Sequence, residues 1–152
     1  MPMGEGLFYF FFDVPLPAGS VNERSHYKNE LSKRFEEWAD PVRLLIERLN
    51  PATVVRVKIH DIEPLHFLVN GRLALLGDSA HTIAPDLGQG GCQAMEDAWV
   101  LAQLLTQYHD LSTALEACDK ARVERVASII TRARKRAETI HRYDPAVTQA
   151  WY

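Results

Sequence analysis

The 152-residue sequence has few of the features that build disulfide-rich, metal-stapled or membrane-spanning proteins. Two cysteines, Cys92 and Cys118, are too few for a disulfide framework or a metal quartet, which favours a reducing, cytoplasmic environment. The longest purely apolar run, Leu7–Phe12, is far shorter than a membrane span, and the first residues lack the basic segment of a secretory signal. Eight glycines and eight prolines exclude collagen-like or low-complexity architecture, and a net charge of −3 argues against bulk nucleic-acid binding.

The sequence does have a hydrophobic fraction of 47%, arranged in alternating and helical patterns. In the first half of the chain these patterns predict four elements: a strand at 6–13 buried on both faces, a helix near His26–Trp38, a helix from Asp40 to about Leu49, and a half-exposed strand at 54–62. Asp40 is expected to be the N-cap of its helix, with Pro41 at the first helical position.

Glycine is concentrated between Gly71 and Gly91, a stretch that holds five of the eight glycines. The apolar run Leu73–Leu76 before the glycine loop predicts a buried strand of a parallel sheet, with an exposed edge where neighbouring strands are missing. Two helices are expected after the loop, one through Met95 to Leu105 and one from Leu115 to Ile140. The basic surplus of 119–142 is interpreted as the solvated face of the second helix rather than a polyanion site. The order strand, acidic turn, glycine loop and helix predicts an α/β (α+β) fold.

The acidic turn and the glycine loop have a clear chemical use. Asp78 follows the predicted strand at the sheet edge that usually faces a ligand, and its carboxylate can accept hydrogen bonds from a polyol. Gly88, Gly90 and Gly91 lack Cβ atoms, so the backbone can approach a flat ligand closely. Their N–H groups open a helix whose dipole favours negative charge. The spacing matches neither the Gly-x-Gly-x-x-Gly dinucleotide fingerprint nor a phosphate loop.

The whole string resembles the second flavin-binding motif of the single-component FAD-dependent hydroxylases. The similar residues are Gly77-Asp78-Ser-Ala-His81, Pro85, Gly88-Gln-Gly-Gly-Cys92 and Glu96-Asp97-Ala98. The resemblance implies the C-terminal part of a FAD-binding Rossmann-like hydroxylase fold, with strands of the substrate-domain sheet and long C-terminal helices. It assigns 1–70 to the substrate-binding region and 71–152 to the second FAD motif and the C-terminal helices. The implied FAD contacts are Asp78, Gly88, Gln89, Gly90, Gly91 and Cys92.

Other segments narrow the similarity to the FAD-dependent urate hydroxylases within this family: residues 8–19, His60–Pro64, Thr82–Asp86, Ala133–Arg136 and Ala150–Tyr152. The implied reaction is hydroxylation of urate to 5-hydroxyisourate, with FAD as cofactor, O₂ as oxidant and NADH or NADPH as reductant. Tyr9 and Asp86 are the implied substrate-binding residues. A related flavin hydroxylase acting on an aromatic acid or a phenol remains an alternative.

One part of the family pattern is missing. The opening strand, Gly-x-Gly-x-x-Gly turn and helix that hold the ADP half of FAD have no counterpart in the sequence. The arginine that serves catalysis in urate hydroxylases would lie upstream of Met1, so no catalytic residue is assigned. The chain is therefore expected to be part of an enzyme, inactive alone and unable to hold FAD tightly. A non-catalytic truncated fragment and one half of a split protein both stay open.

Several other residues are of types that often act in catalysis or metal binding, but a structural role accounts for them equally well. His81 is interpreted as structural, because no nucleophile is indicated beside it. Cys92 is expected to line the flavin site through its backbone rather than through its thiol. Glu96 and Asp97 are expected to favour the helix dipole without a catalytic duty. His60, Asp61 and Glu63 make a poor ligand set, so no metal is predicted.

Overall fold

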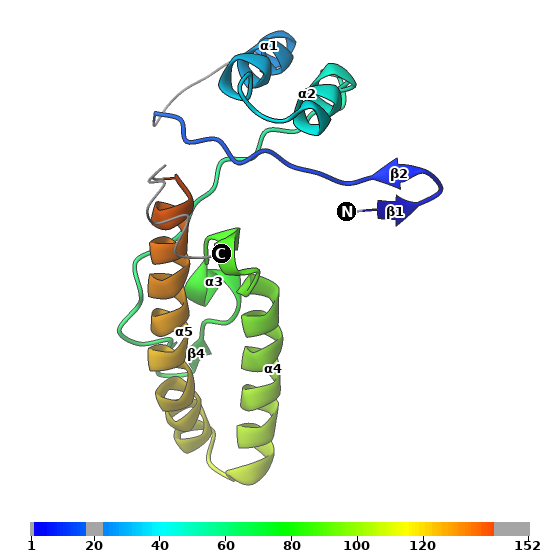
Figure 1. Ribbon diagram of the computed structural model, residues 1–152. Coiled ribbons are helices and arrows are strands. Elements are labelled where there is room, and N and C mark those ends of the chain that lie inside the picture. The colour runs from blue at the N-terminus through cyan, green and yellow to red at the C-terminus, as the bar shows by residue number, and fades with distance from the viewer. Residues whose placement is uncertain (1, 18–22, 142–152) are drawn as a thin grey trace. The chain divides into compact units, whose positions relative to one another are not determined.

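The computed structural model describes residues 2–17 and 23–141, and the chain divides into two compact units, Met1–Val57 and Lys58–Tyr152 (Figure 1). The sequence-based division at residue 70 separates a substrate part from a cofactor part, and it stays a prediction. None of the described helices is long and apolar enough to cross a membrane.

The first unit pairs a short hairpin with two helices. The strands β1 (Pro2–Gly4) and β2 (Leu7–Phe8) are antiparallel, and the helices are α1 (Arg24–Arg34) and α2 (Asp40–Glu47). The Lys28 ammonium on α1 donates to the Glu47 carbonyl at the C-terminus of α2, where a cation is favoured by the helix dipole. Ile46 is 1% exposed, and the ring of Phe35 lies 5.0 Å from that of Phe12. Both predicted helices are confirmed, but the predicted N-cap of α2 is wrong: Ala39 is the N-cap, Asp40 is the first helical residue and Pro41 the second, and the Asp40 carboxylate binds Arg43 instead of capping the helix.

Two strand predictions in the first half of the chain are wrong. In the segment 6–13 only Leu7 and Phe8 are in a strand, and Phe11 is 74% exposed. Burial on both faces needs partner strands and covering layers, and the described residues supply one short partner. The segment 54–62 forms no strand in the described part of the chain, and Val55 and Val57 are 73% and 71% exposed. The boundary between the two units falls inside this segment.

The second unit is a helical hairpin with a small sheet and a turn packed against it. Its elements are β3 (Val69–Asn70), β4 (Leu73–Ala74), α3 (Asp78–His81), the 3₁₀ helix η1 (Pro85–Leu87), α4 (Gly90–Gln107) and α5 (Leu111–His141). α4 and α5 lie side by side and antiparallel, joined by three residues (Figure 1). Both long helices are as predicted. Asp110 caps α5, because its carboxylate accepts a hydrogen bond from the Thr113 N–H at 2.8 Å.

The predicted buried parallel strand is wrong in the described part of the chain. β4 pairs antiparallel with β3 through a two-residue loop in which Gly71 has a φ of +59°, and Leu73 is 60% exposed. A glycine at positive φ suits this tight reversal, so the chain returns beside β3 instead of crossing to a parallel neighbour. The hairpin is attached to α5 through the Asp119 carboxylate, which accepts hydrogen bonds from the Leu68 and Val69 N–H groups at 2.5 and 3.0 Å.

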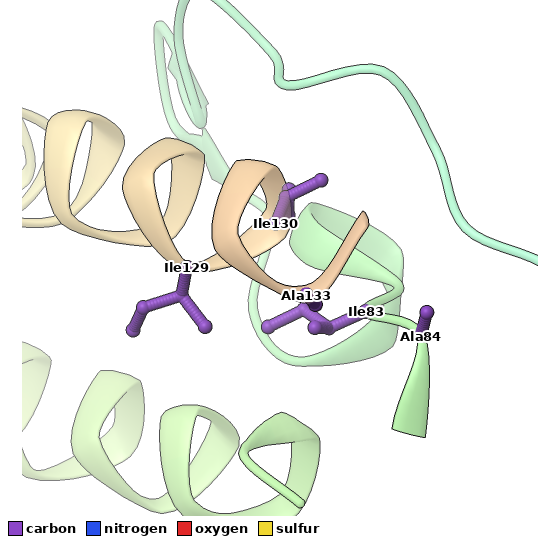
Figure 2. Close-up of a cluster of buried hydrophobic side chains, with 5 residues drawn as sticks. All are labelled: Ile83, Ala84, Ile129, Ile130 and Ala133. Atoms are coloured by element: carbon purple, nitrogen blue, oxygen red, sulfur yellow. The ribbon is translucent and has the colours of Figure 1, made fainter. Parts of the chain in front are cut away.

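Two small apolar clusters join α5 to the rest of the second unit. In Figure 2, Ile129, Ile130 and Ala133 of α5 lie over Ile83 and Ala84, which follow α3. Leu68, Ala80 and Val126 form the second cluster. A third attachment is polar: the Arg134 guanidinium binds Asp61 Oδ2 at 2.5 Å and the Ile62 carbonyl at 2.9 Å. α5 is therefore the element on which the turn after β4 is assembled.

Truncating a core isoleucine of α5 tests this role. Ile130→Ala removes a side chain that is 1% exposed and leaves a cavity, which costs about 2–5 kcal/mol of unfolding free energy. Urea denaturation followed by circular dichroism measures the loss. The matched control is Ile140→Ala on the same helix, where the side chain is 46% exposed and a small change is expected. Equal losses for the two variants would contradict the assignment of the core.

Candidate functional site

The turn that carries Asp78 depends on the backbone of Gly77. Gly77 has φ +58° and ψ −141°, a region that side-chain-bearing residues rarely adopt. A Cβ built there would lie 3.4 Å from Ala94 Cβ on α4, so the turn also packs closely on that helix. Gly77 therefore places Asp78 at the first position of α3, beside the first turns of α4.

A buried carboxylate on α4 fixes this turn. Asp97 is fully buried, and its Oδ2 accepts a hydrogen bond from the Gly77 N–H at 2.8 Å. The same oxygen lies 2.5 Å from Nε2 of His81, which is also fully buried. The two ends of the four-residue helix α3 are thus held by one side chain of α4.

Arg122 of α5 neutralises that carboxylate. Its Nε donates to Asp97 Oδ1 at 2.7 Å, and its Nη2 donates to Gln93 Oε1 at 2.8 Å. Its Nη1 donates to Glu96, which also binds Arg125. Arg122 is only 1% exposed, so this is an ion pair in the interior between two helices. Such a pair requires a partner for every charge, because an uncompensated buried charge costs several kcal/mol, roughly 3–5 on removal of one member.

The electrostatics of the carboxylates follow from these partners. Burial raises the pKa of Asp97, but the hydrogen bonds from Gly77, His81 and Arg122 outweigh burial and hold the pKa below its ordinary value. The Arg125 guanidinium lowers the pKa of Glu96 in the same direction. Both carboxylates of α4 are therefore charged at neutral pH.

His81 has one ring nitrogen that is buried and unsatisfied. Its Nδ1 has no hydrogen-bond partner within the described residues, while Nε2 faces Asp97. With a proton on Nε2 directed at the carboxylate, Nδ1 is an acceptor without a donor. The structural interpretation of His81 fits its complete burial, since no substrate could reach the ring.

The glycine loop lies between η1 and α4. Gly88 ends η1 in the left-handed region at φ +62°, and Gln89 is the N-cap of α4. Gly90, Gly91 and Cys92 form the first turn of the helix, where backbone N–H groups lack helical acceptors. A Cβ at Gly88, Gly90 or Gly91 would meet nothing within 4 Å in the described part of the chain. Packing within this unit therefore gives no reason for glycine at positions 90 and 91.

The predicted site residues are divided between the two units. Asp78 and the loop Gly88–Cys92 lie in the second unit, where Asp97 connects the turn to the helix that the loop begins. The exposed carboxylate of Asp78 makes no hydrogen bond or ion pair with any residue in the ranges 2–17 and 23–141. Asp86 is half-buried in η1, whereas Tyr9 lies in the first unit and is 52% exposed. The assignment of contacts to FAD or substrate stays a prediction for all of them.

A shallow pocket lies next to the glycine loop, between Leu87 and Gln89 and helix α5. It has a volume of about 600 Å³ and is lined by Leu87, Gln89, Lys120, Ala121, Glu124, Arg125, Ser128, Ile129 and Arg132. Its charges are mixed, and Arg125 is already paired with Glu96. The pocket lies between the residues around the glycine loop and α5, and its lining does not include Asp78.

The roles of Asp97 and Arg122 were not predicted from the sequence. Asp97 was expected only to favour the helix dipole, which is wrong, because it is a buried acceptor for three groups. A signal was available in the spacing of α5: Arg122 stands midway between Cys118 and Val126, on the helix face that both bury. An arginine at a core position requires a buried acid, and Asp97 lies on the neighbouring helix.

The residues with a metal-like pattern have another partner. Asp61 and Glu63 both bind the Arg134 guanidinium, which raises the pKa of that arginine. These carboxylates therefore tie the segment before β3 to α5.

Comparison with known proteins matches this architecture to one family. Residues 26–133 match the FAD binding domain family, and the chain belongs to that family. It is 50% identical over 152 residues to an FAD-dependent urate hydroxylase of Klebsiella pneumoniae, and 46% identical over 153 aligned residues to one of Mycolicibacterium vanbaalenii. The whole chain aligns with each, but it spans only about 40% of the length of these curated relatives.

Solved structures show the same relationship. A crystal structure of Klebsiella pneumoniae HpxO complexed with FAD and uric acid has a TM-score of 0.83 and 48% identity, covering 91% of this chain and 36% of that one. A salicylate hydroxylase substrate complex has a TM-score of 0.64 and 29% identity, covering 78% of this chain and 29% of that one. The predicted resemblance and the FAD-dependent hydroxylase fold are confirmed.

Removing the buried carboxylate tests the network. Asp97→Ala leaves Arg122 without its fully buried acidic partner and takes the acceptor away from Gly77 and His81, so we expect a loss of about 3–5 kcal/mol of unfolding free energy. Chemical denaturation measures it. The control is Asp40→Asn, which breaks the surface pair with Arg43 and is expected to leave the unfolding midpoint almost unchanged. A small effect at Asp97 would contradict its role as the acceptor that holds the turn.

The depressed pKa of Asp97 also predicts how stability depends on pH. The unfolded chain binds the proton more tightly than the folded chain, so the contribution of this carboxylate is fully present above the unfolded pKa of about 3.9. It is lost as the pH falls below that value and through the lower folded pKa. Urea denaturation between pH 7 and pH 3 should show this loss, and Asp97→Asn should show a shallower slope below pH 4. Parallel curves for both proteins would overturn the direction of the shift.

Proposed function

We propose that the chain supplies the flavin-facing part of an FAD-dependent monooxygenase that hydroxylates urate to 5-hydroxyisourate with NADH or NADPH as reductant. The observation that carries the proposal is the turn at Gly77 and Asp78. Asp97 holds the Gly77 backbone by a hydrogen bond, and the Asp78 carboxylate next to it is exposed and binds no residue in the described part of the chain. The chain spans about 40% of the relatives it matches, and we propose that it is inactive by itself.

The turn fits the ribityl chain of FAD. A row of hydroxyl groups donates hydrogen bonds, and a charged carboxylate is a strong acceptor for them. Asp78 is exposed, and the backbone next to it is held through Gly77, so little backbone freedom is lost when its carboxylate binds. Asp78 is therefore the group that orients the cofactor in this proposal.

The glycine loop fits the flat edge of the flavin ring. The absence of Cβ atoms at Gly90 and Gly91 leaves open space above the backbone, which a planar ring could fill. The N–H groups of the first turn of α4 lie at the positive end of an 18-residue helix dipole. Bound FAD supplies the oxygen-transferring chemistry, and these N–H groups would stabilise negative charge on its ring.

Tyr9 and Asp86 are the residues proposed to bind the substrate. Asp86 lies in η1, one turn before the glycine loop, so it is connected through Leu87 to the residues proposed to contact the flavin. Tyr9 offers a hydroxyl group and an aromatic face, both of which suit a planar heterocycle such as urate. An aromatic acid or a phenol is the second candidate substrate, favoured by the similarity to the salicylate hydroxylase structure.

The two free cysteines are relevant to the cellular compartment of the protein. Cys92 and Cys118 form no disulfide, and we propose a cytoplasmic setting in agreement with this chemistry.

A fusion protein tests the function. The part of the Klebsiella pneumoniae relative that the chain does not match is joined to residues 1–152, and FAD content and urate-dependent NADH oxidation are measured.

Asp78→Ala should weaken FAD affinity about ten- to a hundredfold, since one or two charge-assisted hydrogen bonds are lost. Asp86→Ala should instead raise the KM for urate and leave FAD affinity unchanged. If Asp78→Ala binds FAD as tightly as the unchanged fusion, the cofactor assignment is wrong. Turnover of salicylate but not urate would select the second substrate class.

A further inference from the structure

Helix α4 has apolar residues on two opposite faces. The inner face packs against α5 and carries the buried Gln93 and Asp97 together with the half-buried Val100, Leu101 and Leu104, which follow at helical spacing. The opposite face, which we call the outer face of α4, consists of Met95, Ala98, Trp99, Ala102 and Leu105. All five residues are exposed, with Met95 at 68% and Trp99 at 65%. These residues recur every three or four positions, so they form one continuous stripe along three turns of helix.

The outer face also lacks charge. α4 has two charged side chains, and both are paired with α5: Asp97 with Arg122, and Glu96 with Arg122 and Arg125. An amphipathic helix at a protein surface directs charged residues to the solvent, whereas a helix that is apolar all round is buried. The pattern of α4 is that of a helix covered on both sides, and in the described structure only one side is covered.

The comparison with longer relatives indicates what could cover the outer face of α4. The whole chain aligns with the Klebsiella pneumoniae relative but accounts for 40% of its length, so most of that protein has no counterpart in this chain. The outer face begins within one turn of the glycine loop, because Met95 follows Gly91 by four residues. A body docked on this stripe would therefore also border the proposed cofactor site.

We propose that the outer face of α4 is the docking surface for the part of an FAD-dependent hydroxylase that this chain lacks, whether that part is joined to it or is a separate chain. The inference rests on the proposed function in its choice of partner. Trp99 is the expected anchor, because a large aromatic side chain at the centre of an apolar patch contributes most to such interfaces. The partner presents an apolar, uncharged surface to it.

The experiment compares the isolated chain with the fusion described above. Hydroxyl-radical footprinting with mass spectrometry measures the modification rates of Met95 and Trp99. We expect rapid modification of both in the isolated chain and at least fivefold protection in the fusion. Trp99→Asp in the fusion should return the modification rate of Met95 to that of the isolated chain. Ile140→Asp, on the exposed side of α5, is the matched control and should leave the protection of Met95 intact.

Three results would overturn the proposal. Equal modification of Met95 and Trp99 in both proteins would show that nothing docks on the outer face. Protection already present in the isolated chain and lost on dilution would assign the face to a second copy. Protection in the isolated chain that does not change on dilution would assign it to another part of the same chain. Urate turnover is measured on the same fusion. Protection of Met95 and Trp99 without turnover would contradict only the proposed reaction, and turnover without protection would contradict only the docking surface.

Discussion

The buried ion pair between Asp97 and Arg122 is the interaction on which the geometry of the second unit depends. A carboxylate and a guanidinium are both expensive to remove from water, so each must find its partner for the helical hairpin to close. Once closed, the carboxylate has acceptor capacity left over, and Gly77 and His81 use it. One ion pair thereby fixes the crossing of α4 and α5 and the turn that presents Asp78.

Glycine serves two different purposes around this turn. At Gly77 the backbone conformation and the proximity of Ala94 make a side chain unfavourable, so the protein itself requires glycine there. At Gly90 and Gly91 the described structure has room for a side chain, and the reason for glycine has to come from something that approaches the loop. This difference separates the residues that build the site from those that face its ligand.

α5 has the same organising role for the segments before the turn. Asp119 holds the backbone of β3, Arg134 holds Asp61 and Ile62, and the isoleucines between them bury Ile83 and Ala84. These attachments are spread over 16 residues, from position 119 to position 134, on one helix. Because they come from one rigid element, the turn and the hairpin before it are positioned together.

The sequence by itself determined the helices, the glycine loop, the acidic turn and the family, because each of these is written in local spacing or in a contiguous motif. The sequence was misleading where burial depends on neighbouring segments: the aromatic segment 6–13 and the alternating segment 54–62 have strand patterns, but residues 2–17 and 23–141 provide no layers that cover them. Leu73 to Leu76 has the composition of a buried strand, yet Gly71 turns it back beside β3. Only the tertiary structure decided that Asp97 is a buried acceptor and that no described residue covers the outer face of α4, because both depend on which side of a helix its neighbour occupies.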